Sequence, residues 1–185
     1  PNKFTVNGLE NQIETKYADW ANNLGLHEPA FEYNTDAQFV EALGKCIDYV
    51  NFKTAPDKRV PIEMIIGQAA LESAWGKSRF AREANNLFGI RTYDTKVPHL
   101  YPEGVTEWKG WGVRKFETKC DGVKFFVELL NNHHAYEKFR KKRESMFYNT
   151  GELDAIQLVK TLDKYSTTPD YADRVISIIK KLRTM

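Results

Sequence analysis

The chain has 185 residues, a length that favours a single domain with a substantial core. Hydrophobic residues make up 42% and charged residues 28%, a balance typical of a globular protein and unlike that of a disordered chain. The formal net charge is only +2, which is not the strong basic field of nucleic-acid-binding proteins, so we expect no nucleic-acid partner.

The first part of the chain is predicted to be helical. Residues 9–24 read as a helix of modest amphipathicity within an N-terminal extension, 1–35. The polar stretch Asn34-Thr35-Asp36 supplies cap chemistry for the next helix, which opens the main domain, 36–185. Apolar residues of that helix recur at helical spacing, namely Phe39, Val40, Leu43, Ile47 and Val50.

A nearly all-apolar helix is predicted over residues 62–75, after a polar loop at 53–59. A helix without a polar face is a buried helix. Pro61 suits its first turn, and Gly76 is expected to stop it. A short helix follows at 78–84.

Residues 86–117 change character, because glycines and prolines separate short β-prone runs there. This pattern predicts a small lobe of turns with one or two hairpins. Helices are then expected after a cap at Asp121, through the basic stretch 135–146, and at 154–163. The last helix is marked by Val175, Ile178, Ile179 and Leu182. The predicted fold class is therefore mainly α, a helical body with a small β-hairpin lobe.

Cysteine and histidine spacing points to no metal or cofactor. Cys46 and Cys120 fit no zinc or redox motif, and no pair of the histidines has metal-ligand spacing. The place of Cys46 on the apolar side of its helix favours a buried thiol, and a disulfide stays open as the alternative. No apolar run is long enough to cross a bilayer, so we expect no stable membrane insertion.

Glu72 is the most informative residue of the sequence. On a helix it lies within about 20° of Ile65 and on the same side as Ala69, among the buried contacts. It also lies in the last turn, where the helix dipole disfavours a negative charge. Both effects favour the protonated acid that general-acid cleavage of a glycoside needs. The alternative is a structural carboxylate paired with Arg79, Arg82 or a backbone amide.

The residues around Glu72 carry a family resemblance. GQAALESAWGKS at 67–78, followed by NNLFGI at 85–90, resembles glycoside hydrolase family 73, the bacterial endo-β-N-acetylglucosaminidases. LNNHHAYEKFR at 130–140 looks like the Bax-type subgroup. Two elements near the C-terminus, at 165–167 and 171–172, look like the family's tyrosine motif. The resemblance covers roughly residues 38–182, and the segment around Glu72 is its diagnostic part.

The resemblance implies a lysozyme-like fold and a set of site residues. Glu72 would be the catalytic acid. Trp75 and the segment Asn86–Phe88 would line the cleft and bind substrate. A tyrosine hydroxyl near the acid would come from Tyr165 or Tyr171, and the sequence does not choose between them.

The family often places a second carboxylate on the β-lobe, where Glu103 and Glu107 are the candidates. The β-prone surroundings of Glu107 favour it, on a hairpin strand, with Glu103 as a substrate contact. A solvated surface glutamate is the competing interpretation. Trp108, in the same lobe, would stack on sugar or anchor the lobe to the body.

The implied function is hydrolysis of peptidoglycan between N-acetylglucosamine and N-acetylmuramic acid, by a monomer whose partner is the glycan strand. Inverting, retaining and substrate-assisted routes all remain open. The alternatives are a muramidase or lytic transglycosylase of the same fold, and a non-catalytic wall-binding module.

The expected location is periplasmic, cell-wall-associated or secreted, with a phage-encoded lysis protein as one context, although Pro1–Phe4 shows no signal-peptide pattern. The basic run 138–143 reads as a solvated helix face, or as a surface for anionic wall polymers.

Overall fold

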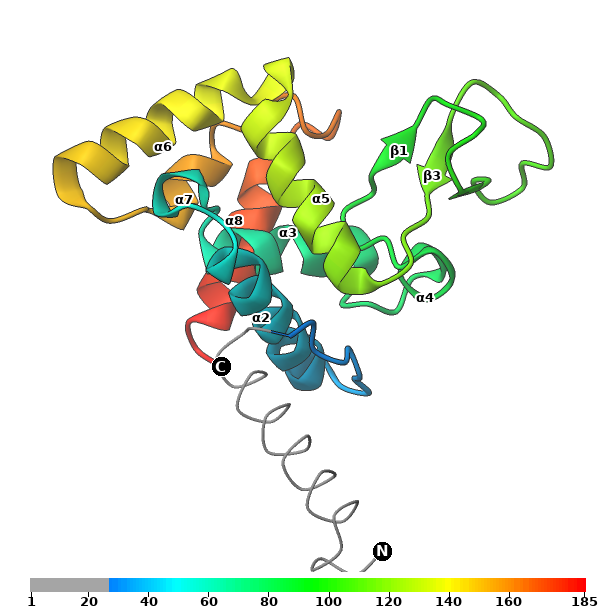
Figure 1. Ribbon diagram of the computed structural model, residues 1–185, viewed down its shortest axis with the longest axis horizontal. Coiled ribbons are helices and arrows are strands. Elements are labelled where there is room, and N and C mark those ends of the chain that lie inside the picture. The colour runs from blue at the N-terminus through cyan, green and yellow to red at the C-terminus, as the bar shows by residue number, and fades with distance from the viewer. Residues whose placement is uncertain (1–26) are drawn as a thin grey trace, which may run out of the picture.

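The computed structural model describes residues 27–185 (Figure 1). The helix predicted at 9–24 lies outside the described residues. Residues 27–35, which the sequence assigned to a helical extension, contain no helix. In this segment the rings of Phe31 and Tyr33 pack edge-on against Phe39, with centroids 6.0 and 5.3 Å away. The segment is therefore packed onto the main body.

The first described helix, α2 (Asp36–Phe52), begins where its polar cap predicts. The hydroxyl of Thr35 accepts from the backbone N–H of Gln38, and the Gln38 side chain accepts from the N–H of Thr35, which completes a capping box. The predicted apolar face is buried at Phe39, Leu43, Ile47 and Val50. A single 3-10 turn, η1 (Pro56–Lys58), interrupts the polar loop that follows.

The central helix α3 (Ile62–Ser73) is buried along most of its length, as predicted. Pro61 precedes it as the N-cap. The prediction that Gly76 ends it is wrong, because the helix stops at Ser73 and Ala74 already takes a left-handed conformation, with φ of 50°. The Ser73 hydroxyl closes this early turn, since it donates to the carbonyl of Ala69 and accepts from the N–H of Gly76.

A short helix, α4 (Arg79–Ala84), leads into the small lobe. The lobe holds three antiparallel strands, β1 (Arg91–Thr92), β2 (His99–Leu100) and β3 (Gly112–Arg114), with β3 in the middle. Figure 1 shows β1 and β3 projecting to one side of the helical body. The lobe is thus held by very short strands and long connections.

The prediction that Glu107 lies on a hairpin strand is wrong. Glu107 lies in the irregular connection between β2 and β3. In this connection Gly104 and Gly110 adopt φ of 75° and 97°, which interrupts an extended backbone. Its β-prone residues therefore make turns instead of a strand.

The remaining helices are α5 (Lys119–Asn132), the 3-10 turn η2 (His134–Tyr136), α6 (Glu137–Thr150), α7 (Ala155–Val159) and α8 (Tyr171–Leu182). The cap of α5 is Thr118, whose hydroxyl accepts from the N–H of Asp121 at 3.0 Å, so the prediction of Asp121 as the cap is wrong by three residues. The helix α7 ends earlier than predicted, at Val159. The last helix is confirmed, and Val175 and Ile179 are fully buried.

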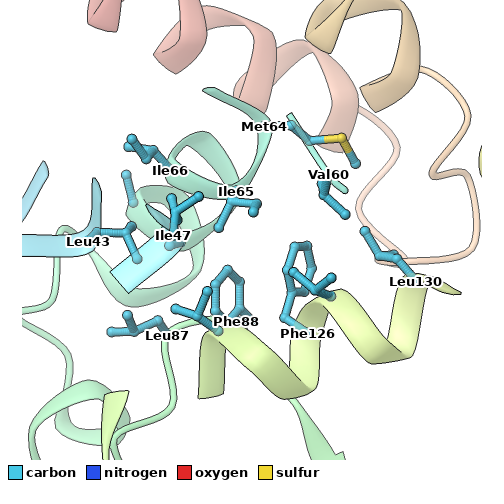
Figure 2. Packing of buried hydrophobic residues seen from close by; sticks show 14 of the residues in the cluster. Leu43, Ile47, Val60, Met64, Ile65, Ile66, Leu87, Phe88, Phe126 and Leu130 are labelled. Carbon is cyan, nitrogen blue, oxygen red and sulfur yellow. The ribbon is translucent and has the colours of Figure 1, made fainter. Parts of the chain in front are cut away.

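The core lies where α2, α3 and α5 meet, and Figure 2 shows part of it. In it the rings of Phe88 and Phe126 stack with centroids 4.2 Å apart.

A disulfide joins Cys46 of α2 to Cys120 of α5, with Cα atoms 5.4 Å apart, so the prediction of a free buried thiol is wrong. The two cysteines meet because α2 and α5 pack side by side. No helix within residues 27–185 is long and apolar enough to span a membrane.

Candidate active site

A groove of about 1220 Å³ opens beside the last turn of α3. Its lining residues come from five places: the end of α3, the beginning of the lobe, one side of α5, the turn η2 that follows α5, and the segment 160–172 that leads into α8. Glu72 lines it from α3, and Arg91 and Tyr93 line it from the lobe. The groove therefore lies between the helical body and the lobe, and a carboxyl group is part of its wall.

Glu72 is partly buried, and burial raises the pKa of its carboxyl above the ordinary value of 4.5, opposed by a hydrogen bond from Tyr171. No ion pair involves Glu72 within residues 27–185. Arg79 donates to the carbonyl of Tyr101 at 2.6 Å and lies 3.7 Å from Glu83. Arg82 lines a separate hollow. Neither arginine therefore forms the ion pair with Glu72 that was the alternative to a catalytic role.

The hydroxyl of Tyr171, at the start of α8, links two residues of α3. It accepts a hydrogen bond from Nε2 of Gln68 at 3.0 Å and donates one to the carboxyl of Glu72. Because Gln68 and Glu72 are four residues apart, they lie on the same side of α3. Burial and the nearby carboxyl raise the pKa of Tyr171, so its proton remains available to Glu72.

Tyr165 is the other tyrosine predicted for the site, and its hydroxyl does not bind the carboxyl of Glu72. It donates to the backbone carbonyl of Phe88 at 2.8 Å, and its ring stacks on Tyr171 with centroids 5.6 Å apart. Burial raises the pKa of Tyr165 well above its usual range. Tyr171 is thus the tyrosine on the acid, and Tyr165 ties the segment before α8 to the loop after α4.

That loop is organised by Asn86, which is buried. Its Nδ2 donates to the carbonyls of Ile90 and Arg114, each at 2.8 Å, and its Oδ1 accepts from the N–H groups of Phe88 and Ile90. The side chain of Asn86 is therefore occupied inside the protein and shapes the groove through the backbone.

Gly89 is the point where this loop meets the acid. Its φ is 66°, a left-handed conformation that favours glycine, and a Cβ built there would lie 3.0 Å from Oε2 of Glu72. Phe88, next to it, lines the groove while its ring is buried against Phe126. The loop thus brings bare backbone against the carboxyl, where a side chain would crowd it.

A family model described as mannosyl-glycoprotein endo-beta-N-acetylglucosaminidase matches residues 52–184, which hold Glu72, the loop and both tyrosines. The chain belongs to the glucosaminidase family, glycoside hydrolase family 73. The resemblance predicted from the motif at 67–78 is confirmed.

Known relatives agree with this assignment of the glucosaminidase domain. Protein bax of Escherichia coli K12 is 34% identical over 108 residues, which are 58% of this chain and 37% of bax. Exo-glucosaminidase LytG of Bacillus subtilis 168 is 32% identical over 121 residues, which are 63% of this chain and 42% of LytG. The alignments thus span about two fifths of the length of each relative.

The glycoside hydrolase domain of Salmonella typhimurium FlgJ has the same fold. Its structure superposes with a TM-score of 0.60 at 24% identity, covering 82% of this chain and 91% of that one. The mainly α, lysozyme-like fold with a small β-containing lobe is confirmed.

Asn86, described above, and four other residues expected at the site of the glucosaminidase domain lie away from the groove lining. Trp75 lines a separate hollow, where the Lys181 ammonium lies 4.7 Å from its ring centroid. Glu103 is exposed in a turn, and Glu107 is exposed and paired with Lys109. Trp108 packs edge-on against His99, with centroids 4.9 Å apart, which is the anchoring contact within the lobe.

Other residues of the groove were not predicted from the sequence. Tyr93 lines the groove and is 73% exposed, a flat apolar surface for a ligand. Asp163 is the one other carboxylate among the described lining residues. The sequence placed it at the end of a helix predicted at 154–163 and gave no reason to assign it to the site. His133 and Tyr136 also line the groove, and both fall within the motif at 130–140 that had already been singled out.

Proposed function

We propose that this glucosaminidase domain hydrolyses the glycan strand of peptidoglycan at the β-1,4 bond between N-acetylglucosamine and N-acetylmuramic acid. The observation that carries the proposal is a carboxyl of raised pKa, free of ion pairs within residues 27–185, in the wall of a groove. Family membership and relatives named peptidoglycan hydrolase support the substrate class.

Glu72 acts as the general acid. It donates its proton to the glycosidic oxygen, because an unprotonated sugar alkoxide leaves poorly. Burial raises the pKa of this carboxyl, so Glu72 keeps its proton to a higher pH than an ordinary glutamate does. The hydroxyl of Tyr171 then stabilises the carboxylate that forms, since it already donates to it.

The attacking group completes the reaction. We propose that the acetamido oxygen of the substrate attacks the anomeric carbon while the leaving oxygen takes the proton of Glu72, because this route needs no enzymic nucleophile. Water then opens the cyclic oxazolinium that forms and returns a proton to the Glu72 carboxylate. Two carboxylates provide the alternatives for positioning water. Glu107 was expected from the sequence, and it would require the connection between β2 and β3 to bring it to the groove. Asp163 lines the groove and lies 3.5 Å from the Lys138 ammonium.

The decisive experiment applies the purified domain and Glu72→Gln to isolated cell walls, scored by turbidity and by mass spectrometry of the products. The wild type should release fragments with N-acetylglucosamine at the reducing end. Glu72→Gln should be roughly 10²- to 10⁴-fold slower, since it removes the general acid. Wall binding should be equal for the two proteins.

Each rival gives a different result. Fragments with reducing-end or anhydro muramic acid would identify a muramidase or a lytic transglycosylase. Wall binding without clearing by either protein would identify a binding module. The length distribution of early fragments separates endo cleavage from the exo cleavage for which LytG is named.

A second pair of variants, Glu107→Gln and Asp163→Asn, tests the attacking group. If the acetamido group attacks, both variants should keep kcat within about tenfold of the wild type. A loss as large as that of Glu72→Gln would assign the water or the nucleophile to that carboxylate.

The compartment follows from the same proposal. A disulfide between Cys46 and Cys120 persists in oxidising surroundings and is rare in the cytosol. We place the domain at the cell wall, in the periplasm or outside the cell, where its substrate lies, and acting as a monomer. Analytical ultracentrifugation of the oxidised protein checks the monomer.

A further inference from the structure

The basic run on α6 divides into two groups with different roles. The guanidinium of Arg140 donates to two backbone carbonyls at the end of α5. Arg143 is buried and donates to the carbonyls of residues 58–59 and to Oδ1 of Asn131 at 2.6 Å. Both arginines hold the fold together. The solvated face predicted for this run is therefore left to the lysines.

Those lysines face a hollow of about 490 Å³ beside α7, which packs against α6 (Figure 1). Its lining has no carboxylate among the described residues and consists of Lys138, Lys141, Lys142, Ser145, Gln157, Lys160 and Thr161. Two of the ammonium groups form exposed ion pairs, Lys138 with Asp163 and Lys141 with Glu137. Lys142 and Lys160 form none within residues 27–185. The hollow therefore offers positive charge to an anion.

The hollow lies next to the groove that holds Glu72. Lys160 lines both of them. The ion pair between Lys138 and Asp163, at 3.5 Å, joins a residue of the hollow to a residue of the groove. A polymer lying in the groove can thus place a side branch in the hollow without leaving the protein surface.

We propose that this lysine hollow, formed by α6, α7 and the two residues after α7, binds the carboxylates of the peptide stem during cleavage. This inference rests on the proposed function, since it takes peptidoglycan as the polymer in the groove. The stem branches from N-acetylmuramic acid, the sugar next to the scissile bond, and its free carboxylates match an ammonium cluster. Solvated lysine–carboxylate pairs are individually weak, so the hollow selects stem-bearing strands through several of them.

The test uses soluble, uncross-linked glycan strands in two forms, with stems and after removal of the stems by an amidase. Neither form carries phosphate polymers. Removal of the stem frees the lactyl carboxylate of each muramic acid, so stripped strands carry a carboxylate at the sugar and lack those of the stem. The comparison therefore reports carboxylates held on the stem. The variant is Lys141→Gln/Lys142→Gln, because both lysines line the hollow and neither lines the groove. The matched control is Lys180→Gln, an exposed lysine near the end of α8.

The double variant should raise KM for stem-bearing strands by roughly three- to tenfold at unchanged kcat, since it removes binding that is equal in ground and transition states. KM for stripped strands should not change, and Lys180→Gln should match the wild type on both. The difference should vanish at about 1 M salt.

Two outcomes would overturn this inference while leaving the proposed function intact. The first is an unchanged KM of the double variant on stem-bearing strands. The second is an equal rise on stripped strands, which would place the lysines on the glycan or in the fold. Failure of the wild type to cleave either form would instead refute the proposed function itself.

Discussion

The two sides of the groove are built by different means. On the body side, Glu72 belongs to α3, which is buried along most of its length and packed against α8. On the lobe side, Arg91 lies in β1 and Tyr93 directly follows it, in a lobe whose strands have two or three residues. Core packing therefore fixes the acid, whereas loop geometry fixes what faces it. The loop organised by Asn86 lies between the two and carries Gly89 to the carboxyl.

The largest effect is expected in the body, on removal of the disulfide with Cys46→Ala/Cys120→Ala. The bond closes a loop across 74 residues of sequence, so its loss should cost about 2–4 kcal/mol. Calorimetry should show Tm falling by roughly 5–15 °C. Reduction of the wild type should give a similar fall, and cell-wall clearing at room temperature should persist in both. An unchanged Tm would show that α2 and α5 hold without the bond.

An intermediate effect is expected in the loop between body and lobe, with Gly89→Ala. Both Gly89 and Gly104 have left-handed φ, 66° and 75°, but only the Cβ at position 89 would contact Glu72. Each alanine should cost about 1–2 kcal/mol of stability through its backbone conformation. Activity should fall roughly tenfold in Gly89→Ala and stay near wild type in the control, Gly104→Ala. Equal activity of the two variants would remove Gly89 from the site.

A smaller effect is expected on the body side, with Tyr171→Phe. The hydrogen bond from this tyrosine stabilises the ionised form of Glu72 and so lowers its pKa. Its loss should raise the Glu72 pKa and move the alkaline limb of the pH–activity profile to higher pH, with kcat reduced roughly three- to tenfold.

The matched control is Tyr165→Phe, which loses a hydrogen bond to the carbonyl of Phe88 and none to the acid. Its unfolding free energy should fall by about 1–3 kcal/mol, because a buried carbonyl is left unpaired. Its alkaline limb should stay in place. A shift to lower pH in Tyr171→Phe would contradict the assigned direction of the hydrogen bond.

The contrast between body and lobe also explains what the sequence could predict. Helical periodicity identified α8, since its buried residues recur every three or four positions. A nearly all-apolar run identified α3, in which residues 64–70 are all buried. The position of Glu72 among the apolar contacts of α3 followed from the same period. The motif at 67–78 added the family.

The lobe and the connections have no such period. Glu107 was expected on a strand, and two left-handed glycines turn that segment into an irregular connection. The Cys46–Cys120 pair depends on the packing of helices that are 74 residues apart in sequence. The choice of Tyr171 over Tyr165 depends on which hydroxyl reaches Glu72, and local sequence does not encode this.

The central claim is that burial keeps Glu72 protonated to a higher pH than an ordinary glutamate. The direct test is the difference in unfolding free energy between Glu72→Gln and the wild type, measured from about pH 4 to about pH 8. Because the folded-state pKa is raised above 4.5, ionisation of Glu72 costs the folded state stability as pH rises through that pKa. Near pH 4 the two proteins should be equally stable, and Glu72→Gln should become the more stable one as pH rises. A constant difference, or a wild type that gains stability over Glu72→Gln at high pH, would contradict the account.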